Sequence, residues 1–157
     1  MTSSPEPKPH CCGEPRNRYV IDCAGARVHV HARSVATVLR IDGEIDAANA
    51  DLVAEVVRRF ARLNAPLVLD LSGLDFLGSA GLRALLLLNE EHRAAQLHNN
   101  VVRGAALGRL TRVVTDHGLP VVDSVPEALQ NTHDFIRARR RFLAGLARQG
   151  EPQRKAP

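Results

Sequence analysis

Residues 66–88 read PLVLDLSGLDFLGSAGLRALLLL, and this stretch decides the fold. Its opening apolar run at 67–69 is typical of a buried strand. The dipeptide at 72–73, Ser-Gly, ends that strand as turn residues do, and residues 74–77 place further apolar side chains in a loop. A leucine-rich pattern then predicts a helix over about 80–96. The stretch therefore predicts a strand, a loop and a helix in direct succession.

A small hydroxyl residue, Ser79, stands where this helix begins, between Gly78 and Gly81. The position predicts an N-cap, because a serine side chain accepts a hydrogen bond from an N–H of the first helical turn. The two glycines leave the backbone open to close approach. A helix N-terminus also favours a phosphate, through its free N–H groups and its dipole. Ser79 is therefore either a plain cap or a phosphoacceptor.

Two strands and a helix are expected before this stretch. Residues 26–31 alternate apolar and polar side chains, which predicts a half-exposed edge strand with His29 and His31 on its wet face. A second strand over 35–41 is expected to end at the turn signal Asp42-Gly43. The helix that follows is capped by Asp46 or Asn49. Its core positions have helical spacing: Ala48, Leu52, Val53, Val56, Val57 and Phe60.

Four further elements are expected after it. A short buried strand at 101–102 and the tight loop Gly104-Ala105-Ala106 precede a helix over 107–117 that ends at Gly118. Its inward positions are Leu107, Leu110, Val113 and Val114. A last strand at 119–122 leads to a helix over 125–148. Ser124 and Glu127 form its capping box.

The alternation of strands and helices indicates one α/β domain with a mostly parallel central sheet packed by helices and with an N-terminal strand. We expect a disordered tail over 1–18, because four prolines stand there among polar residues without periodicity. The domain is expected over 19–148, including the C-terminal helix, followed by a flexible C-terminus over 149–157.

Composition narrows the function classes. With 157 residues, 45% of them hydrophobic but only 3% aromatic, the core must be aliphatic, and stacking platforms for nucleic-acid bases are scarce. Three cysteines form no disulfide framework, and His10-Cys11-Cys12 lacks the second ligand pair that zinc needs. The sequence contains no nucleotide-binding fingerprint, no signal peptide and no apolar run long enough to span a membrane. These features predict a cytoplasmic protein that contacts no membrane.

Three segments carry a resemblance to a known family. They are GEID at 43–46, VLDLSGLDFLGSAGLRAL at 68–85 and VVRGAALGRLTRVVTDHGL at 101–119. Over roughly 28–129 the chain resembles the STAS domain of bacterial anti-sigma factor antagonists. The resemblance implies a small α/β fold with no metal, no cofactor and no enzymatic activity.

The same resemblance implies a function. Members bind an anti-sigma factor that is often also a serine kinase, which releases a sigma factor, and phosphorylation of one serine at the loop-to-helix junction ends the binding. Ser79 occupies that serine's position, and Asp46 matches a family carboxylate. The chain departs from the family at Gly78, where Asp is common, and at Ala80, where a second serine often stands. The partner-binding residues implied here are Asp46, Gly78, Ser79, Ala80, Gly81, Leu82 and Arg83.

The C-terminal helix leaves alternatives open. Arg137, Arg140, Arg141 and Arg148 fall on nearly one side of it, which suggests a nucleic-acid-binding regulator as the second hypothesis. The scarcity of aromatic residues and the net charge of only +4 count against direct nucleic-acid binding, and a small hydrolase ranks last because no nucleophile, base and orienting acid assemble. Its apolar stripe predicts that the first half packs on the sheet. The second half then extends past the domain and offers Phe142 and Leu146 to a partner or a second copy, so a homodimer stays open.

Overall fold

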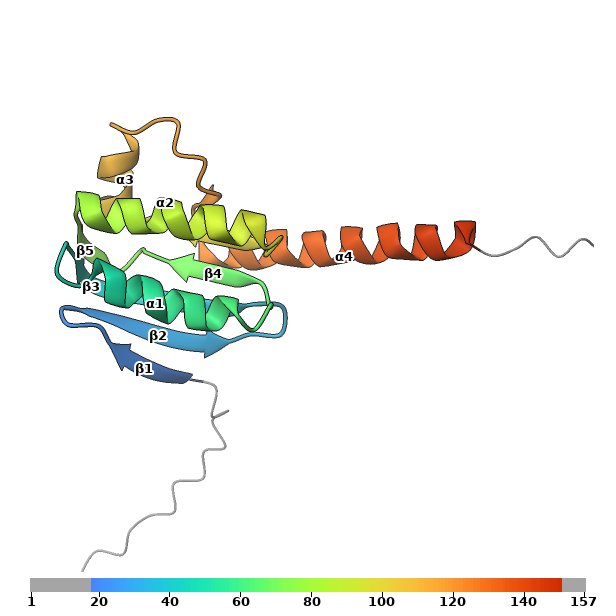
Figure 1. The fold of residues 1–157 in the computed structure, drawn as a ribbon, viewed down its shortest axis with the longest axis horizontal. Helices are drawn as coiled ribbons and strands as arrows, with labels where there is room; N and C mark the ends of the chain where they lie inside the picture. Colours follow the sequence, from blue (N-terminus) through green and yellow to red (C-terminus); the bar gives the residue numbers. More distant parts are fainter. Residues whose placement is uncertain (1–17, 151–157) are drawn as a thin grey trace, which may run out of the picture.

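The computed structural model describes residues 18–150, in which seven strands and four helices alternate (Figure 1). The strands are β1 Arg18–Asp22, β2 Ala26–Ala32, β3 Thr37–Ile45, β4 Leu67–Asp70, β5 Leu74–Leu77, β6 Asn99–Val102 and β7 Val121–Val122. The helices are α1 Ala50–Ala61, α2 Ser79–Ala94, α3 Ala105–Thr111 and α4 Val125–Gln149. The expected disorder of the N-terminal tail and the Cys11-Cys12 pair lie outside the described residues.

The strands form one sheet in the order β1-β2-β3-β4-β6-β7, and β5 also pairs with β3. The β1–β2 and β2–β3 pairs are antiparallel, whereas all later pairs are parallel, which confirms the expected mostly parallel sheet. The prediction that residues 26–31 form an edge strand is wrong. β1 takes the edge, and β2 lies inside the sheet between β1 and β3.

The predicted turn at Asp42-Gly43 is also wrong, because β3 runs through it to Ile45. Gly43 adopts a φ of +94° beside a register shift, so the turn signal is absorbed as an irregularity within the strand. A Cβ at Gly43 would lie 2.4 Å from the Gly25 carbonyl oxygen, so a side chain does not fit there. The extra length gives β3 two successive parallel partners, β4 along its first half and β5 along its second.

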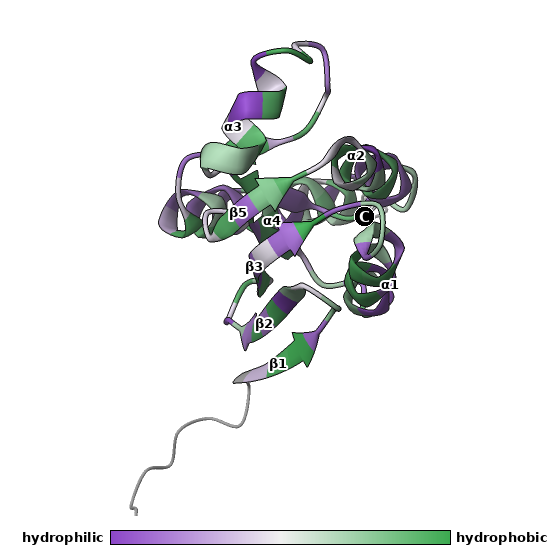
Figure 2. Ribbon diagram, turned by 90° about the vertical axis from the view of Figure 1, so that its left-hand side faces the viewer, coloured by the Kyte–Doolittle hydropathy of each residue, from purple (hydrophilic) through white to green (hydrophobic). Residues whose placement is uncertain are grey.

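Helices cover both faces of the sheet. α1 and α2 lie side by side on one face, as Figures 1 and 2 show, above the larger core, which includes Leu39 and Leu69. The first half of α4 covers the other face, where Val38 and Val68 face Ala128. Because consecutive residues of a strand point to opposite faces, the central strands must be apolar throughout. The continuous apolar run that opens β4 is the visible result.

The helices depart from expectation in two places. Leu52 on α1 is 46% exposed, and Ala48 is exposed before the helix begins, so neither is a core residue. α3 ends at Thr111, so Val113 and Val114 are exposed rather than inward, and Gly118 lies in a loop. The β-branched run after Thr111 disfavours continuation of the helix.

α4 matches its prediction closely and spans Val125–Gln149. The Ser124 hydroxyl oxygen accepts from the Glu127 N–H at 3.2 Å, as the capping box requires. The Glu127 carboxylate accepts from the N–H of Asp123, one residue earlier than in the standard box.

Candidate functional site

The N-terminus of α2 is the centre of the candidate site. Ser79 is the first helical residue and is exposed, whereas Gly78 holds the N-cap position with extended backbone angles and no side-chain cap bond. The prediction that Ser79 is the N-cap is therefore wrong by one residue. The Leu82 N–H donates to the Gly78 carbonyl oxygen at 3.0 Å, the first bond of the helix. The N–H groups of Ser79, Ala80 and Gly81 precede that bond and have no partner within the helix.

Parallel pairing of β3 with β5 brings the predicted carboxylate, Asp46, to the same edge of the sheet as Ser79. Ile45 pairs with Leu77, and the Gly78 N–H donates to the Ile45 carbonyl oxygen at 2.8 Å. The next residue along β3 is Asp46, which is exposed. One of its carboxylate oxygens accepts from the Ala48 N–H at 2.9 Å and so shapes the turn into α1.

A buried amide that sequence reasoning considered only as a cap holds this edge together. The Asn49 side chain, 1% exposed, donates to the carbonyl oxygens of Glu44 at 2.8 Å and Ala24 at 3.2 Å. Its own oxygen accepts from the Asp46 N–H at 2.9 Å. Asn49 therefore ties the end of β3 to the β1–β2 connection and fixes the backbone that carries Asp46. The sequence showed only an asparagine beside the start of a helix. That local pattern cannot reveal hydrogen-bond partners that are distant in the sequence.

Gly78 and Gly81, at the junction of β5 and α2, have different structural roles. A Cβ on Gly81 would lie 2.5 Å from Leu77 Cδ1 and 2.8 Å from Ile45 Cγ2, so Gly81 lets α2 sit directly on the strand ends. Gly81 and Leu82 are both buried, beneath the surface on which a partner would rest. Gly78 has a φ of −80°, which any residue adopts, and a Cβ there would contact only the Phe76 ring closely, at 3.3 Å.

The exposed surface around Ser79 combines charge with apolar area. Arg83 lies one helical turn beyond Ser79, and Leu87 one turn further, on the same face of α2. Leu87 is 49% exposed, and Phe76 in the neighbouring strand is 48% exposed. Sequence reasoning placed Phe76 in a loop and assigned Leu87 to neither face of the helix. The pattern of a leucine-rich helix does not distinguish a leucine on the outer face from one in the core.

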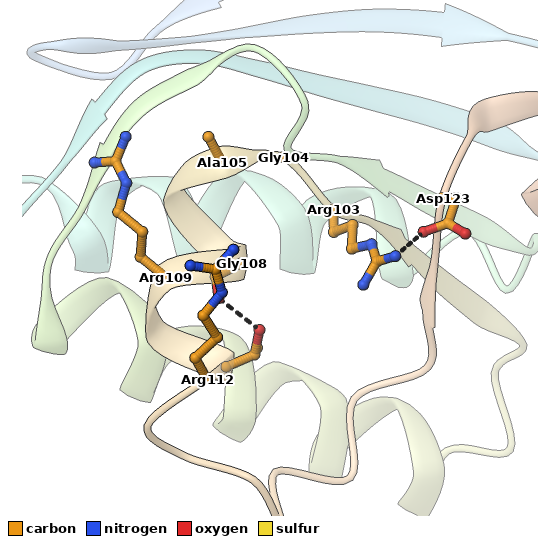
Figure 3. Close-up of a pocket in the computed structure, with 8 residues that line it drawn as sticks. Arg103, Gly104, Ala105, Gly108, Arg109, Arg112 and Asp123 are labelled. Atoms are coloured by element: carbon orange, nitrogen blue, oxygen red, sulfur yellow. Dashed lines mark hydrogen bonds and ion pairs between the residues drawn. The ribbon is translucent and has the colours of Figure 1, made fainter.

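A separate hollow of about 740 Å³ lies beside α3, between the ends of β6 and β7 (Figure 3). Three arginines line it, and the sequence pattern did not predict it. The Arg103 guanidinium is paired with the Asp123 carboxylate at 2.6 Å, and Arg109 and Arg112 are exposed.

The described residues offer little for metal or thiol chemistry. Within 18–150, no group of three or more His, Cys, Asp or Glu side chains is placed to hold a metal ion. Burial, together with the nearby Asp22 charge, raises the pKa of the Cys23 thiol, which disfavours the thiolate that a nucleophile requires. In the part of the chain that the structure describes, none of the helices is long and apolar enough to cross a bilayer.

Comparison with known proteins places this geometry in a family. Residues 26–128 match the model of the STAS domain. The chain is 35% identical over 151 residues to Osmosensory protein A of Mycobacterium tuberculosis, covering 92% of this chain and 96% of that protein. Its fold is similar to the crystal structure of an anti-sigma factor antagonist from Mycobacterium paratuberculosis. The TM-score is 0.60 and the identity 28%, over 69% of this chain and 94% of that one. The unphosphorylated anti-sigma factor antagonist SpoIIAA shares the fold at a TM-score of 0.52 and 18% identity, covering 70% of this chain and 97% of that one.

Proposed function

We propose that this chain, because it belongs to the STAS domain family, acts as an anti-sigma factor antagonist. It binds an anti-sigma factor in the cytoplasm and thereby releases a sigma factor for transcription, without catalysing a reaction itself. The fold neighbours described as antagonists support this assignment. The observation that carries it is the exposed Ser79 at the first position of α2, beside the end of β3.

The proposed contact surface follows from exposure. Asp46, Ser79 and Arg83 are exposed at the carboxyl edge of the sheet, and Ala80 and Gly78 are half-buried between them. Phe76 and Leu87 add apolar area at either side, which a partner gains by covering. Gly81 and Leu82 contribute from below, by fixing how α2 sits on the sheet.

Ser79 is proposed as the residue that a serine kinase, in particular the anti-sigma factor itself, phosphorylates to end binding. A phosphate there faces the free N–H groups and positive dipole end of a 16-residue helix, so the modified domain stays folded. It adds about −1.5 to −2 charges on a surface that already carries Asp46 and Asp75. A partner surface that fits the bare hydroxyl then meets both repulsion and a steric obstacle.

The test begins with identifying the partner. A pull-down from the native cytoplasm followed by mass spectrometry should recover a protein with an ATPase-fold serine kinase domain. Calorimetry against that partner should show that Ser79→Ala retains affinity, whereas Ser79→Asp loses about a hundredfold, or roughly 2.8 kcal/mol. Ser34→Asp is the matched control, because Ser34 is also exposed but lies in the turn before β3, at the opposite end of that strand. Equal affinities for Ser79→Ala and Ser79→Asp would contradict the switch, and a recovered partner that neither binds nor phosphorylates the chain would contradict the function.

A further inference from the structure

The second half of α4 has no cover within its own domain. α4 has 25 residues and is about 37 Å long, whereas the four-residue strands it crosses extend only about 13 Å. The helix therefore overhangs the sheet, as Figure 1 shows. Every residue from 137 to 150 is exposed. We call residues 137–149 the overhang.

The overhang is amphipathic and continues a stripe that starts on the domain. Phe135, Arg139, Phe142 and Leu146 follow one another at intervals of four, three and four residues, so they share one face of the helix. The three apolar members are 37%, 66% and 50% exposed. Leu143 widens the stripe and is 54% exposed. An isolated helix of this length is marginal in water, so a partner that covers the stripe would stabilise it.

A groove lies where the overhang leaves the domain. Its hollow of about 660 Å³ is bounded on one side by Phe135, Phe142 and Leu143 and on the other by Leu97 and His98. The His98 ring stacks on the Phe135 ring with centroids 4.4 Å apart. Burial lowers the pKa of His98, so its ring is uncharged at neutral pH. The remaining lining is mixed: Pro120 is apolar, and Gln96, Asn99, Asn100 and Arg139 are polar. The stripe thus offers projecting apolar side chains at its free end and a recess with apolar walls at its base.

The stripe is symmetric in a way that suits one kind of occupant. The spacing of four, three and four reads the same in both directions, with its midpoint between Arg140 and Arg141. Two such helices placed antiparallel bring Leu146 of one copy against Phe135 of the other, at the groove. The same register sets Arg139 of each copy against the Phe142 ring of the other, a favourable cation–π geometry. A two-fold interface requires a surface that is complementary to itself after a rotation of 180°.

The charges of α4 agree with the same register. The overhang contains five arginines and no acidic residue. Arg137, Arg140, Arg141 and Arg148 lie on the side away from the stripe, so pairing through the stripe keeps the two basic faces apart.

We propose that α4 pairs antiparallel with α4 of a second copy of this chain, each overhang covering the groove of the other. The inference stands independently of the proposed function, since the surface it uses shares no residue with the edge around Ser79. The occupant is a second copy because the stripe and the groove complement themselves in one register.

Sedimentation velocity of the full chain over a wide concentration range tests the pairing. The expected result is a dimer whose dissociation constant rises at least about tenfold in Leu146→Glu, because the glutamate would be buried at the groove. Val113→Glu is the matched control: Val113 is 83% exposed but lies after α3, outside the stripe, and its replacement should leave the dimer unchanged. A full-length chain that stays monomeric at all concentrations overturns the proposal. So does a dimer that Leu146→Glu does not weaken.

A pair of arginine substitutions tests the register itself. Arg139→Ala should weaken the dimer, because it removes the contact with the Phe142 ring of the second copy, whereas Arg148→Ala, on the side away from the stripe, should leave it unchanged. Both positions are exposed in the single chain, so the substitutions leave the domain folded, which thermal melting verifies. An Arg139→Ala dimer as tight as the original, or an equal loss in Arg148→Ala, overturns the antiparallel register. If the monomer instead binds vesicles of phosphatidylglycerol, or a duplex oligonucleotide in place of a second copy, the overhang serves an anionic surface and the proposal is overturned.

Discussion

Replacement of Asn49 by alanine should destabilise the domain by an amount that follows from three hydrogen bonds. The Asn49 side chain bonds the carbonyl oxygens of Ala24 and Glu44 and the N–H of Asp46, at 3.2, 2.8 and 2.9 Å. It is 1% exposed, so alanine leaves these backbone groups without their partner in a space from which water is largely excluded.

Each bond contributes a net free energy of about 1 kcal/mol, so Asn49→Ala should lower the free energy of unfolding by about 3 kcal/mol. For a domain near 150 residues, each kcal/mol corresponds to roughly 2–4 °C, so the melting temperature should fall by roughly 10 °C. Asn49→Asp should be at least as destabilising, because a carboxylate oxygen would replace the amide that donates to the two carbonyl oxygens.

Urea unfolding followed by far-ultraviolet circular dichroism measures the change, with the slope of the transition confirming a two-state comparison. Asn131→Ala is the matched control. Asn131 is exposed on α4, and its replacement should change stability by less than about 0.5 kcal/mol. A loss below about 1 kcal/mol for Asn49→Ala would refute the reasoning, because the three bonds would then be replaced by water without cost.

Three further outcomes are expected from particular contacts. Burial lowers the pKa of His92, so the folded state resists the proton that the unfolded state takes up; stability should be full above about pH 6.5 and fall as the solution is acidified. His92→Leu should flatten that slope in melting temperature against pH, leaving the part due to His98, whose pKa burial also lowers. Gly81→Ala should cost about 1–3 kcal/mol through overpacking, whereas Gly145→Ala, with open space around it, should gain up to about 1 kcal/mol in the same unfolding assay. Ser124→Ala should cost about 1 kcal/mol by removing the α4 cap, and an unchanged midpoint would show that the cap bond contributes nothing.

Local chemistry explains what the sequence predicted correctly. The capping box of Ser124 and Glu127 predicted the start of α4, because both partners of each capping bond lie within four residues of each other. The apolar run of β4 announced a central strand, because a strand buried on both faces carries no alternation. The resemblance at 68–85 placed Ser79 at the start of α2 within one residue.

Distant partners explain what the sequence missed. β5 has four residues between glycine-containing turns, and only its pairing with β3 makes it a strand. β1 is an edge strand with Tyr19 and Val20 half exposed, so its burial pattern is weak. The three partners of Asn49 come from β3, its exit turn and the β1–β2 connection, and no local pattern links them. Gly43 was interpreted as a turn residue because glycine with positive φ is common in turns. The same conformation also occurs at irregularities within strands, and here it lets β3 continue past Gly43.

The topology of the sheet keeps the two proposed surfaces apart. Ser79 and Asp46 lie where parallel strands end, at the carboxyl edge of the sheet. α4 follows β7, which is parallel to β6, and then runs back across the sheet, so its free half must emerge beyond the amino edge (Figure 1). The groove confirms this placement, because residues that begin β6 line it.

Pairing through α4 therefore leaves both Ser79 edges uncovered and directed away from each other. Such a dimer presents two copies of the antagonist surface, and a dimeric anti-sigma factor that reached both would bind more tightly than either site alone through effective concentration. Leu146→Glu would then weaken that binding without touching the surface around Ser79.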